Sequence, residues 1–532
     1  MEIRLKKKRK LSFLGAILIG LLPAAACNLP VRAIQPSYDS DRATLVASLF
    51  NTQTPDSSLN PVQPLATDVS ALPTAQISPF QSLATIGPGE TAATFYLTPP
   101  PEIFFYYSLP GDTLPALTKR FAVAPQQIVS QGQLPPTGFI PVGQVLTIPN
   151  LFEKTTPAYA LLPDSEIVFG PSTIDFDIQE WIRKENGYLA AYSETVEQDT
   201  LSGAEIVHRV ALETSINPRI LLAVLDFRAG WVSGQPSPAR KINFPIGFEV
   251  PQYTGLYKEL ILTARQLTIG YYGWRSGDIT QITFTDSSQI RIAPTLNAGS
   301  AAIQYLFATL YKPVEWEKAL YLPDSFIQFY QSRYGDPWQR AVVVEPILPA
   351  DLQQPVLELP FLPGLNWSFS GGPHIAWGTG SPRGALDFAP ASTTAGCTVS
   401  SVWATASAPG LVIRSDNAVV ILDLDGDGFE QTGWVLLYLH IAEQDRIPAG
   451  TWLETDDYIG HPSCEGGKAT GTHVHITRKY HGEWISADGP VPFTMSGWQV
   501  TAGDLPFSGT LTKDGLIVTS RPDGSHTSII RR

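Results

Sequence analysis

The pattern of hydrophobic and polar positions divides the chain into stretches with different expected structure. In the last third of the chain, short apolar runs recur between polar turns, which predicts a mainly-β domain over about residues 355–505. After it, residues 506–532 predict at most two strands and then a polar C-terminal tail. The strands expected in the domain are 400–404, 410–414, 418–424, 433–441 and 473–480, and those expected after it are 509–511 and 516–519.

Between about residues 165 and 350 the apolar spacing becomes helical. Residues 206–211 form an amphipathic stripe, and the run breaks at Asn217-Pro218. Strongly apolar segments at 220–225 and 301–310 predict two further helices. This stretch is therefore expected to be a helical middle domain.

Residues 103–150 have the pattern of a small βααβ unit. The stretch 107–114 predicts a strand, a Gly-Asp turn and the start of a helix, and Ile128-Val129 is expected on a second helix. Residues 141–149 close the unit with a strand. The Gly-Asp-Thr-Leu core and the Pro-x-Gly-Gln-x-Leu-x-Ile-Pro ending resemble a lysin-motif (LysM) domain. That resemblance implies a module that binds the N-acetylglucosamine chain of peptidoglycan or chitin.

The N-terminus has the order of an export signal. Residues 1–27 contain five consecutive basic residues, an apolar run and three alanines before Cys27. A cysteine in this place resembles a bacterial lipobox, which implies lipid on Cys27 and a membrane-anchored lipoprotein. A plain secreted protein and an uncleaved anchor are the alternatives, and each places the body of the protein outside the cytoplasmic membrane. Residues 28–102 are rich in Pro, Ser, Thr, Gln and Ala without sustained periodicity, which predicts a disordered linker.

Composition and charge exclude few functions. The chain has 532 residues, of which 43% are hydrophobic, so it can form several domains with their own cores. Its formal net charge is −13, and no extended basic stretch follows the first ten residues, which argues against a nucleic-acid partner.

Histidines gather in the β-rich domain. Of the eight histidines in the chain, six lie between residues 374 and 481, and His473 and His475 are two positions apart. Alternate residues of a strand point to the same face, so these two imidazoles would project together. With Asp387 and two further histidines upstream, they are the donor types of a zinc site. An isolated His-x-His pair would be no more than a polar strand face.

Two cysteines remain once Cys27 is set aside as a lipid site. Cys397 and Cys464 form an even pair in a compartment expected to be oxidising, which favours a disulfide. Zinc thiolates are the competing interpretation, although neither cysteine has a close Cys-x-x-Cys partner.

The middle domain, residues 165–350, contains a stretch similar to the catalytic helix of lysozyme-like lytic transglycosylases. The stretch is Asn-Pro-Arg-Ile-Leu-Leu-Ala-Val-Leu-Asp-Phe-Arg-Ala-Gly-Trp at 217–231. Those enzymes need a carboxylic acid to protonate the glycosidic oxygen, but Arg228 holds that position here. Asp226 lies two residues away and would face another side of the helix. The resemblance thus implies a spacer or a glycan-binding surface without the catalytic acid; an unrelated helical domain is the alternative.

The final domain resembles the lysostaphin-type (LytM-like) zinc endopeptidases, which cut peptides of peptidoglycan. The matching pieces are Ala-Leu-Asp-Phe-Ala around Asp387, Leu-Tyr-Leu-His-Ile around His440, and Gly-Thr-His-Val-His ending at His475. The resemblance implies a Zn²⁺ cofactor, hydrolysis of peptide bonds and peptidoglycan as the partner.

One position departs from the usual family pattern. Most members place the first zinc histidine four residues before the aspartate, where this chain has Arg383. His374 lies thirteen residues before Asp387, a longer spacing that is similar to the staphylolysin-like branch of the family. The resemblance therefore implies His374, Asp387 and His475 as metal ligands. The cysteine ahead of the His-x-His matches that branch too.

The remaining histidines supply the expected proton chemistry. The sequence has no His-Glu-x-x-His helix, so His440 and His473 are the candidates for proton transfer and for stabilising the oxyanion. The rival hypothesis is a non-catalytic peptidoglycan-binding or regulatory lipoprotein with a degenerate peptidase domain, which Arg383 would favour. An intact set of histidines favours the enzyme.

A weaker motif lies at residues 423–428. Asp-Leu-Asp-Gly-Asp-Gly imitates the start of a calcium loop, but Trp434 stands where a bidentate glutamate is expected. A tight acidic turn between strands is the favoured interpretation.

Overall fold

A computed structural model describes residues 102–391, 396–523 and 525–532. The expected export signal, Cys27 and nearly all of the expected linker lie outside these residues. In the described part of the chain, no helix combines the length and the apolar character that crossing a bilayer requires.

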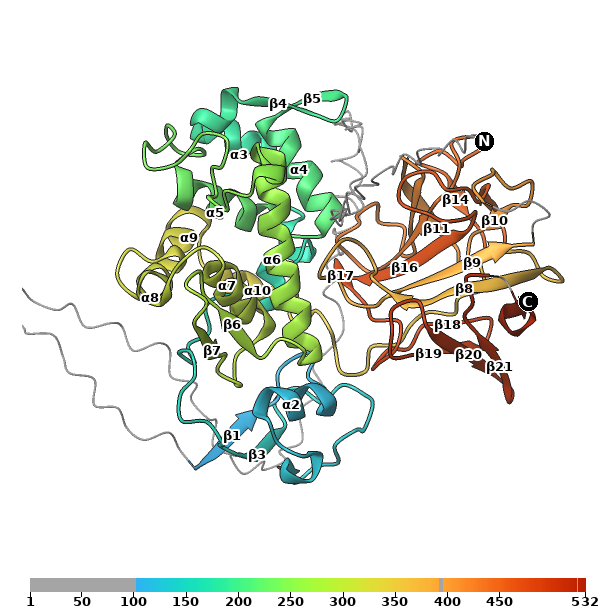
Figure 1. The fold of residues 1–532 in the computed structure, drawn as a ribbon, viewed down its shortest axis with the longest axis horizontal. Coiled ribbons are helices and arrows are strands. Elements are labelled where there is room, and N and C mark those ends of the chain that lie inside the picture. The colour runs from blue at the N-terminus through green and yellow to red at the C-terminus, as the bar shows by residue number, and fades with distance from the viewer. Residues whose placement is uncertain (1–101, 392–395, 524) are drawn as a thin grey trace, which may run out of the picture. The chain divides into compact units, whose positions relative to one another are not determined.

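The first described domain is a three-stranded sheet with one helix packed on it (Figure 1). Strand β1 (Ile103–Tyr107) pairs with β3 (Val145–Pro149), which also pairs with β2 (Val129–Ser130). Helix α2 (Leu114–Phe121) begins after Thr113, whose side chain accepts the Ala116 N–H. The buried side chains of this small core are Tyr106, Leu117, Phe121, Val123, Ile128, Ile140, Leu146 and Ile148.

The prediction of a second helix in this domain is wrong. Residues 125–127 make a single 3₁₀ turn, and Val129 lies in β2 instead of in a helix. Pro125 starts that turn and the Gln127 side chain accepts the Ala124 N–H, so the local hydrogen bonds are satisfied within a few residues. Ser130 can then pair with β3. The lysin-motif assignment itself stays a prediction.

The middle domain is helical, as expected. Two small hairpins, β4 (Ser193–Val196) with β5 (Asp199–Ser202) and β6 (Gln281–Thr283) with β7 (Gln289–Arg291), interrupt the helices. Ser202 and Glu205 form a capping box at the first residues of α4, and Asn217 caps α5. The helices are α3 (Ile178–Glu185), α4 (Gly203–Thr214), α5 (Pro218–Ala229), α6 (Leu256–Ser276), α7 (Ala298–Ala308), α8 (Pro313–Tyr321), α9 (Phe326–Tyr334) and α10 (Pro337–Val344).

Arg228 has a structural place in this domain. It is buried near the end of α5, where its Nε donates to the Ile246 carbonyl at 2.8 Å and its guanidinium lies over the ring of Tyr311. The Asp226 carboxylate accepts the N–H groups of Val232 and Ser233, which fixes the loop after the helix. Both side chains are buried and held by these local contacts.

The C-terminal domain is built on a nine-stranded antiparallel sheet. Its strand order is β14-β11-β12-β13-β16-β9-β8-β22, and β17 pairs with β16. A four-stranded sheet, β18-β19-β20-β21, completes the domain, and β10 pairs with β15. The strands are β8 (Asn366–His374), β9 (Ala385–Pro390), β10 (Ala404–Thr405), β11 (Gly410–Asp416), β12 (Val419–Asp423), β13 (Trp434–Leu439), β14 (Trp452–Leu453), β15 (Tyr458–Gly460), β16 (Val474–Tyr480), β17 (Glu483–Trp484), β18 (Thr494–Met495), β19 (Trp498–Ala502), β20 (Gly509–Lys513), β21 (Leu516–Thr519) and β22 (Ile529–Arg531).

The central strands are buried on both faces. Along β12 and β13, odd-numbered residues such as Ile421 and Leu437 belong to the core of the middle domain. Even-numbered residues such as Leu422 and Leu436 belong to the core of the C-terminal domain. This two-residue alternation places the middle domain against one face of the sheet.

Two expectations at the edges of this domain are corrected. Residues 400–404 are mostly irregular, and only Ala404 enters a strand there. Residues 506–532 are not a tail, because β22 pairs with β8 at the edge of the main sheet. Its register is set by alternation, since Ile530 is buried and Ile529 is exposed.

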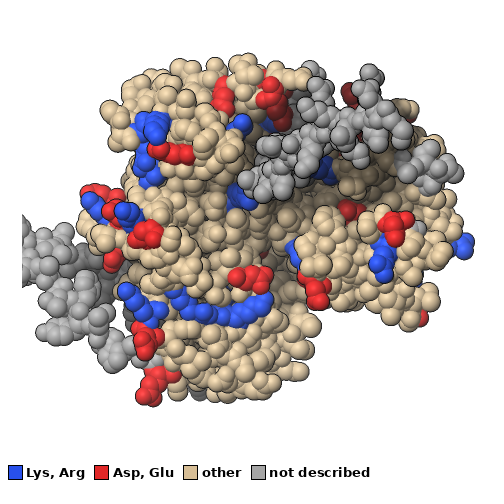
Figure 2. Space-filling view, in the orientation of Figure 1, with Lys and Arg blue, Asp and Glu red and all other residues tan. Residues whose placement is uncertain are grey.

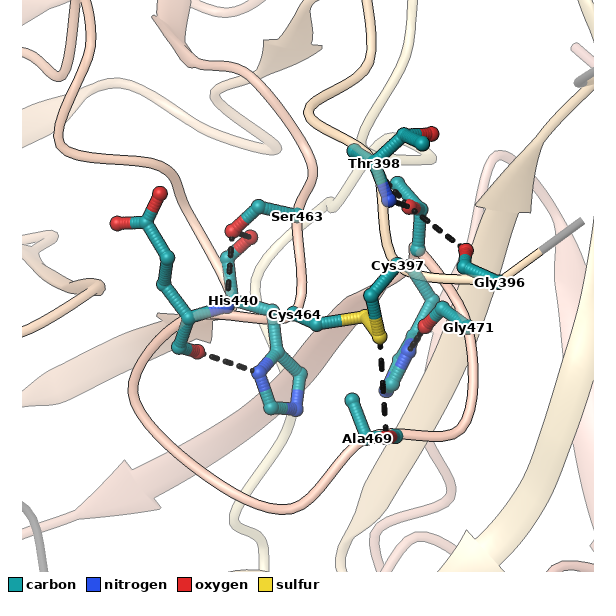
Figure 3. Close-up of a disulfide and its surroundings, with 11 residues drawn as sticks. Gly396, Cys397, Thr398, His440, Ser463, Cys464, Ala469 and Gly471 are labelled. Atoms are coloured by element: carbon teal, nitrogen blue, oxygen red, sulfur yellow. Dashed lines mark hydrogen bonds between the residues drawn. A yellow bond between two sulfur atoms is a disulfide. The ribbon is translucent and has the colours of Figure 1, made fainter. Parts of the chain in front are cut away.

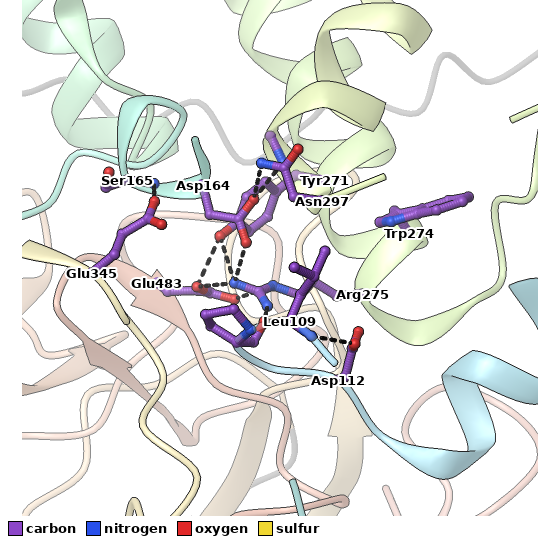
Figure 4. A network of polar contacts seen from close by, with 12 residues as sticks. Leu109, Asp112, Asp164, Ser165, Tyr271, Trp274, Arg275, Asn297, Glu345 and Glu483 are labelled. Atoms are coloured by element: carbon purple, nitrogen blue, oxygen red, sulfur yellow. Dashed lines mark hydrogen bonds and ion pairs between the residues drawn. The ribbon is translucent and has the colours of Figure 1, made fainter. Parts of the chain in front are cut away.

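Arg275 on α6 connects all three domains (Figure 4). Its guanidinium lies 3.1 Å from an Asp164 carboxylate oxygen and 3.2 Å from a Glu483 oxygen on β17, and it donates to the Pro110 carbonyl of the first domain. Tyr271 donates to the same glutamate at 2.9 Å. The buried arginine therefore compensates two buried carboxylates from different parts of the chain.

Charges elsewhere are dispersed. On the face shown in Figure 2, basic and acidic side chains occur close to one another and most of the surface is uncharged. Basic side chains form a narrow band at the lower left of this view (Figure 2), with acidic side chains above and below it.

Candidate metal centre

Two of the predicted ligands face each other on adjacent strands. His475 on β16 is paired directly with Asp387 on β9, and both point to the face of the sheet opposite their apolar neighbours. His374 is the last residue of β8, the strand next to β9. The sheet register thus brings together residues that are 101 positions apart in the chain.

The three side chains converge in a small buried space. Each offers a ligand atom within 4.8 Å of the others, and all three residues are buried. The Asp387 Oδ1 lies 3.3 Å from His374 Nε2 and 3.4 Å from His475 Nδ1. Gly371, opposite Asp387 on β8, makes this possible, because a Cβ there would lie 2.4 Å from Asp387 Oδ2.

Backbone carbonyls fix the orientation of both imidazoles. His374 Nδ1 lies 2.8 Å from the Gly372 carbonyl, and His475 Nε2 lies 3.0 Å from the Ala376 carbonyl. A carbonyl only accepts, so these nitrogens carry the protons. The opposite nitrogens, His374 Nε2 and His475 Nδ1, lie 3.0 Å apart and carry the lone pairs when both rings are neutral.

The electrostatics of the site follow from burial and from these close groups. Burial acts to raise the pKa of Asp387, but His374 and His473 outweigh it and hold that pKa well below its usual range. Burial acts to lower the pKa of His374, and Asp387 reverses the shift. Burial lowers the pKa of His475. The carboxylate is therefore ionised at neutral pH.

His440 and His473 lie beside the three predicted ligands. Their ring centroids are 4.5 Å apart, and His473 Nε2 is 3.7 Å from Asp387 Oδ1. His440 Nδ1 lies 2.7 Å from the Glu465 carbonyl, and His473 Nδ1 lies 2.7 Å from the Gly471 carbonyl. In the neutral form of each ring the proton therefore lies on Nδ1 and the lone pair on Nε2. Burial, together with the neighbouring His473, lowers the pKa of His440 to about 3.

The expected disulfide is confirmed. Cys397 is bonded to Cys464, which precedes Glu465, and the bond lies close to both Gly471 and His440 (Figure 3). It connects the loop that orients His440 to the segment beside the residues before β16, where Thr398 N–H donates to the Thr472 hydroxyl at 3.0 Å. Zinc thiolates are therefore not formed by these cysteines.

Arg383 is outside the group of candidate ligands. Its Nε donates to the Pro373 carbonyl at 3.1 Å, and its Nη2 donates to the carbonyls of Gly503 and Leu505 at 2.9 and 2.6 Å. It fixes the 503–508 loop beside the end of β8.

That loop supplies a residue that the sequence analysis missed. The Phe507 ring stacks on the His374 imidazole with centroids 4.1 Å apart, and it stays 54% exposed. Phe507 is 133 positions from His374 and belongs to no recognisable motif, so only the tertiary structure places it at the site.

Comparison with known proteins supports one class, the LasA-like M23 metalloendopeptidases. Residues 160–349 match the family described as LasA, N-terminal domain. That match covers most of the helical middle domain, whose resemblance to lytic transglycosylases stays a prediction.

The individual relatives are distant. Protease LasA of Pseudomonas aeruginosa (strain UCBPP-PA14) is 24% identical over 349 residues, which cover 63% of this chain and 77% of that protein. The beta-lytic metalloendopeptidase of Lysobacter enzymogenes is 26% identical over 167 residues, which cover 30% of this chain and 90% of the relative. Among solved structures, the M23 metalloprotease pseudoalterin is 21% identical with a TM-score of 0.28, covering 34% of this chain and 99% of that one.

Proposed function

We propose that this chain is a zinc metalloendopeptidase of the cell envelope that hydrolyses peptide bonds of peptidoglycan. One observation carries the proposal: His374, Asp387 and His475 converge in a buried space, with His440 and His473 beside them. Two nitrogens and one oxygen are the donor set of a catalytic zinc site that keeps a position open for water or substrate.

The residues present fit a zinc ion on physical grounds. His374 Nε2 and His475 Nδ1 face each other at 3.0 Å, and in the neutral rings both of these atoms carry lone pairs, because the other nitrogen of each ring donates to a backbone carbonyl. The buried Asp387 Oδ1 between them has no hydrogen-bond donor among the described residues. Three lone-pair atoms around one point are stabilised by a cation. Bound zinc would supply Lewis acidity and lower the pKa of a coordinated water toward about 7.

The chain's own residues supply the proton transfers. His440 donates its Nδ1 proton to a backbone carbonyl, so its Nε2 is the atom that would accept a proton. The Glu465 carbonyl holds that ring in one tautomer, and the Gly471 carbonyl does the same for His473. When His473 is protonated, its Nε2 can donate a hydrogen bond to a developing oxyanion.

The rest of the chain would deliver this site to its substrate. The first domain would bind the glycan as a lysin motif does, and lipid on Cys27 would anchor the exported protein to the membrane through the linker. The Gly-Asp-Thr-Leu motif and the basic–apolar–small–Cys order support these two parts of the proposal.

The test measures zinc content and peptidoglycan hydrolysis in the full-length protein. We expect about one zinc per chain in wild type, and His374→Ala to lose both zinc and hydrolysis. His440→Ala and His473→Ala should keep the metal while turnover falls about 10²–10⁴-fold. His526→Ala is the matched control, because His526 is exposed in the 3₁₀ turn before β22 and outside the site.

Two results would contradict the proposal. Full zinc and wild-type hydrolysis in His374→Ala would remove that residue from the ligand set. A wild-type protein that binds no zinc and releases no peptide would instead support the non-catalytic, peptidoglycan-binding alternative.

A further inference from the structure

A second cluster of oxygen ligands lies at the other end of the sheet. Asp423 ends β12, and Asp425 and Asp427 follow in the turn that leads to β13. Each of the three offers a carboxylate oxygen within 4.8 Å of the others. The turn adjoins Trp434 at the start of β13, whereas His440 follows the last residue of that strand. The cluster is thus about 20 Å from the candidate zinc site along the strand.

Asp423 is the unusual member of this cluster. Asp425 and Asp427 are exposed, but Asp423 is completely buried. Its Oδ2 accepts the Gly428 N–H at 2.8 Å, and its Oδ1 has no hydrogen-bond partner among the described residues. A buried carboxylate oxygen without a donor is costly unless a cation or a proton occupies the place beside it.

No basic side chain nearby supplies that positive charge. Within the described ranges, no ion pair involves any of the three aspartates, and Arg414 and Lys479 both pair with Glu430 instead. Burial lowers the pKa of the nearby His481 imidazole below its ordinary value, so it is neutral at pH 7. Burial and the two neighbouring aspartates raise the pKa of Asp423, which is the expected effect of uncompensated like charges.

We propose that the 423–433 turn binds one Ca²⁺ ion through the carboxylates of Asp423, Asp425 and Asp427. The donors are all oxygens, which a hard cation prefers and which differ from the nitrogen-rich zinc site. Trp434 stands where a calcium loop has its bidentate glutamate, so water would complete the coordination. The expected dissociation constant is therefore that of weak extracellular calcium sites, about 10⁻⁴–10⁻³ M. An ion at this turn takes the place of the simple acidic turn that the sequence favours.

The ion would stabilise the sheet without taking part in hydrolysis. It would hold the end of β12 against the beginning of β13, and β13 pairs with β16, which carries His475. Binding to the folded state alone raises the unfolding temperature as the ion concentration exceeds the dissociation constant. Hydrolysis at saturating zinc should be unchanged at temperatures well below unfolding.

The test uses the zinc-loaded full-length protein after calcium has been removed. Terbium is a luminescent probe for calcium sites, and the Trp452 indole lies beside the turn, 2.8 Å from the position of a Cβ on Gly426. We expect sensitised terbium emission that calcium displaces and magnesium does not. Calcium at about 10 mM should raise the melting temperature by about 3–10 °C.

The variants identify the site. The double variant Asp425→Asn/Asp427→Asn changes only exposed side chains, so it should fold, and it should lose both the terbium signal and the calcium-dependent shift. Asp514→Asn, in the exposed turn between β20 and β21, is the matched control and should retain both. Absence of both effects in wild type would overturn the proposal, and so would their persistence in the double variant.

Discussion

Removing the Cys397–Cys464 cross-link should destabilise the C-terminal domain and impair turnover without removing the metal ligands. The bond closes a loop of 67 residues. The entropy that such a loop loses in the unfolded chain corresponds to about 4 kcal/mol of stabilisation. For a domain of 150–250 residues, each kcal/mol shifts the melting temperature by about 2–4 °C, so the loss should be about 10 °C. The double variant Cys397→Ser/Cys464→Ser leaves no unpaired thiol in the domain.

The same variant separates positioning from metal binding. The three candidate ligands lie on β8, β9 and β16, whereas the disulfide fixes the segments whose carbonyls orient His440 and His473. Zinc content should therefore stay near that of wild type while turnover falls by roughly tenfold or more, because small displacements of catalytic groups are costly. Calorimetry, metal analysis and a peptidoglycan hydrolysis assay measure the three quantities. An unchanged melting temperature, or a loss of zinc that parallels the loss of turnover, would refute this reasoning.

Two further predictions concern packing around the sheet. Gly371→Ala should displace the Asp387 carboxylate and reduce zinc content, because the added Cβ would lie 2.4 Å from its Oδ2. Zinc content equal to that of wild type would contradict this steric account. Arg275→Met should destabilise the folded chain by about 3–5 kcal/mol, because it leaves the buried Glu483 without its cation. Chemical denaturation measures this change, and a midpoint equal to that of wild type would show that the ion pair contributes little.

The candidate site was predictable from sequence to the extent that it depends on local strand geometry. His473 and His475 share a short motif, and the resemblance of the segments around Asp387 and His440 to one enzyme family identified their expected roles. The long spacing between His374 and Asp387 was also readable, because Arg383 has no lone pair to offer a metal at neutral pH. The strand at Val129, where a second helix is expected, was not predictable from sequence. The backbone there is decided by pairing with β3, a contact distant in sequence.

The sequence by itself determined the order of the domains, the types of donor atoms and the two cysteines able to form a bond. These depend on residue identity and on periodicities of two or about 3.6 residues, which are local properties. Only the tertiary structure placed Phe507 on His374, Arg275 between two buried carboxylates, and β22 at the edge of the main sheet. It also left the buried Oδ1 of Asp423 without a donor. The physical reason is that burial and the pairing of distant strands depend on how the whole chain packs, and no short window of sequence contains that information.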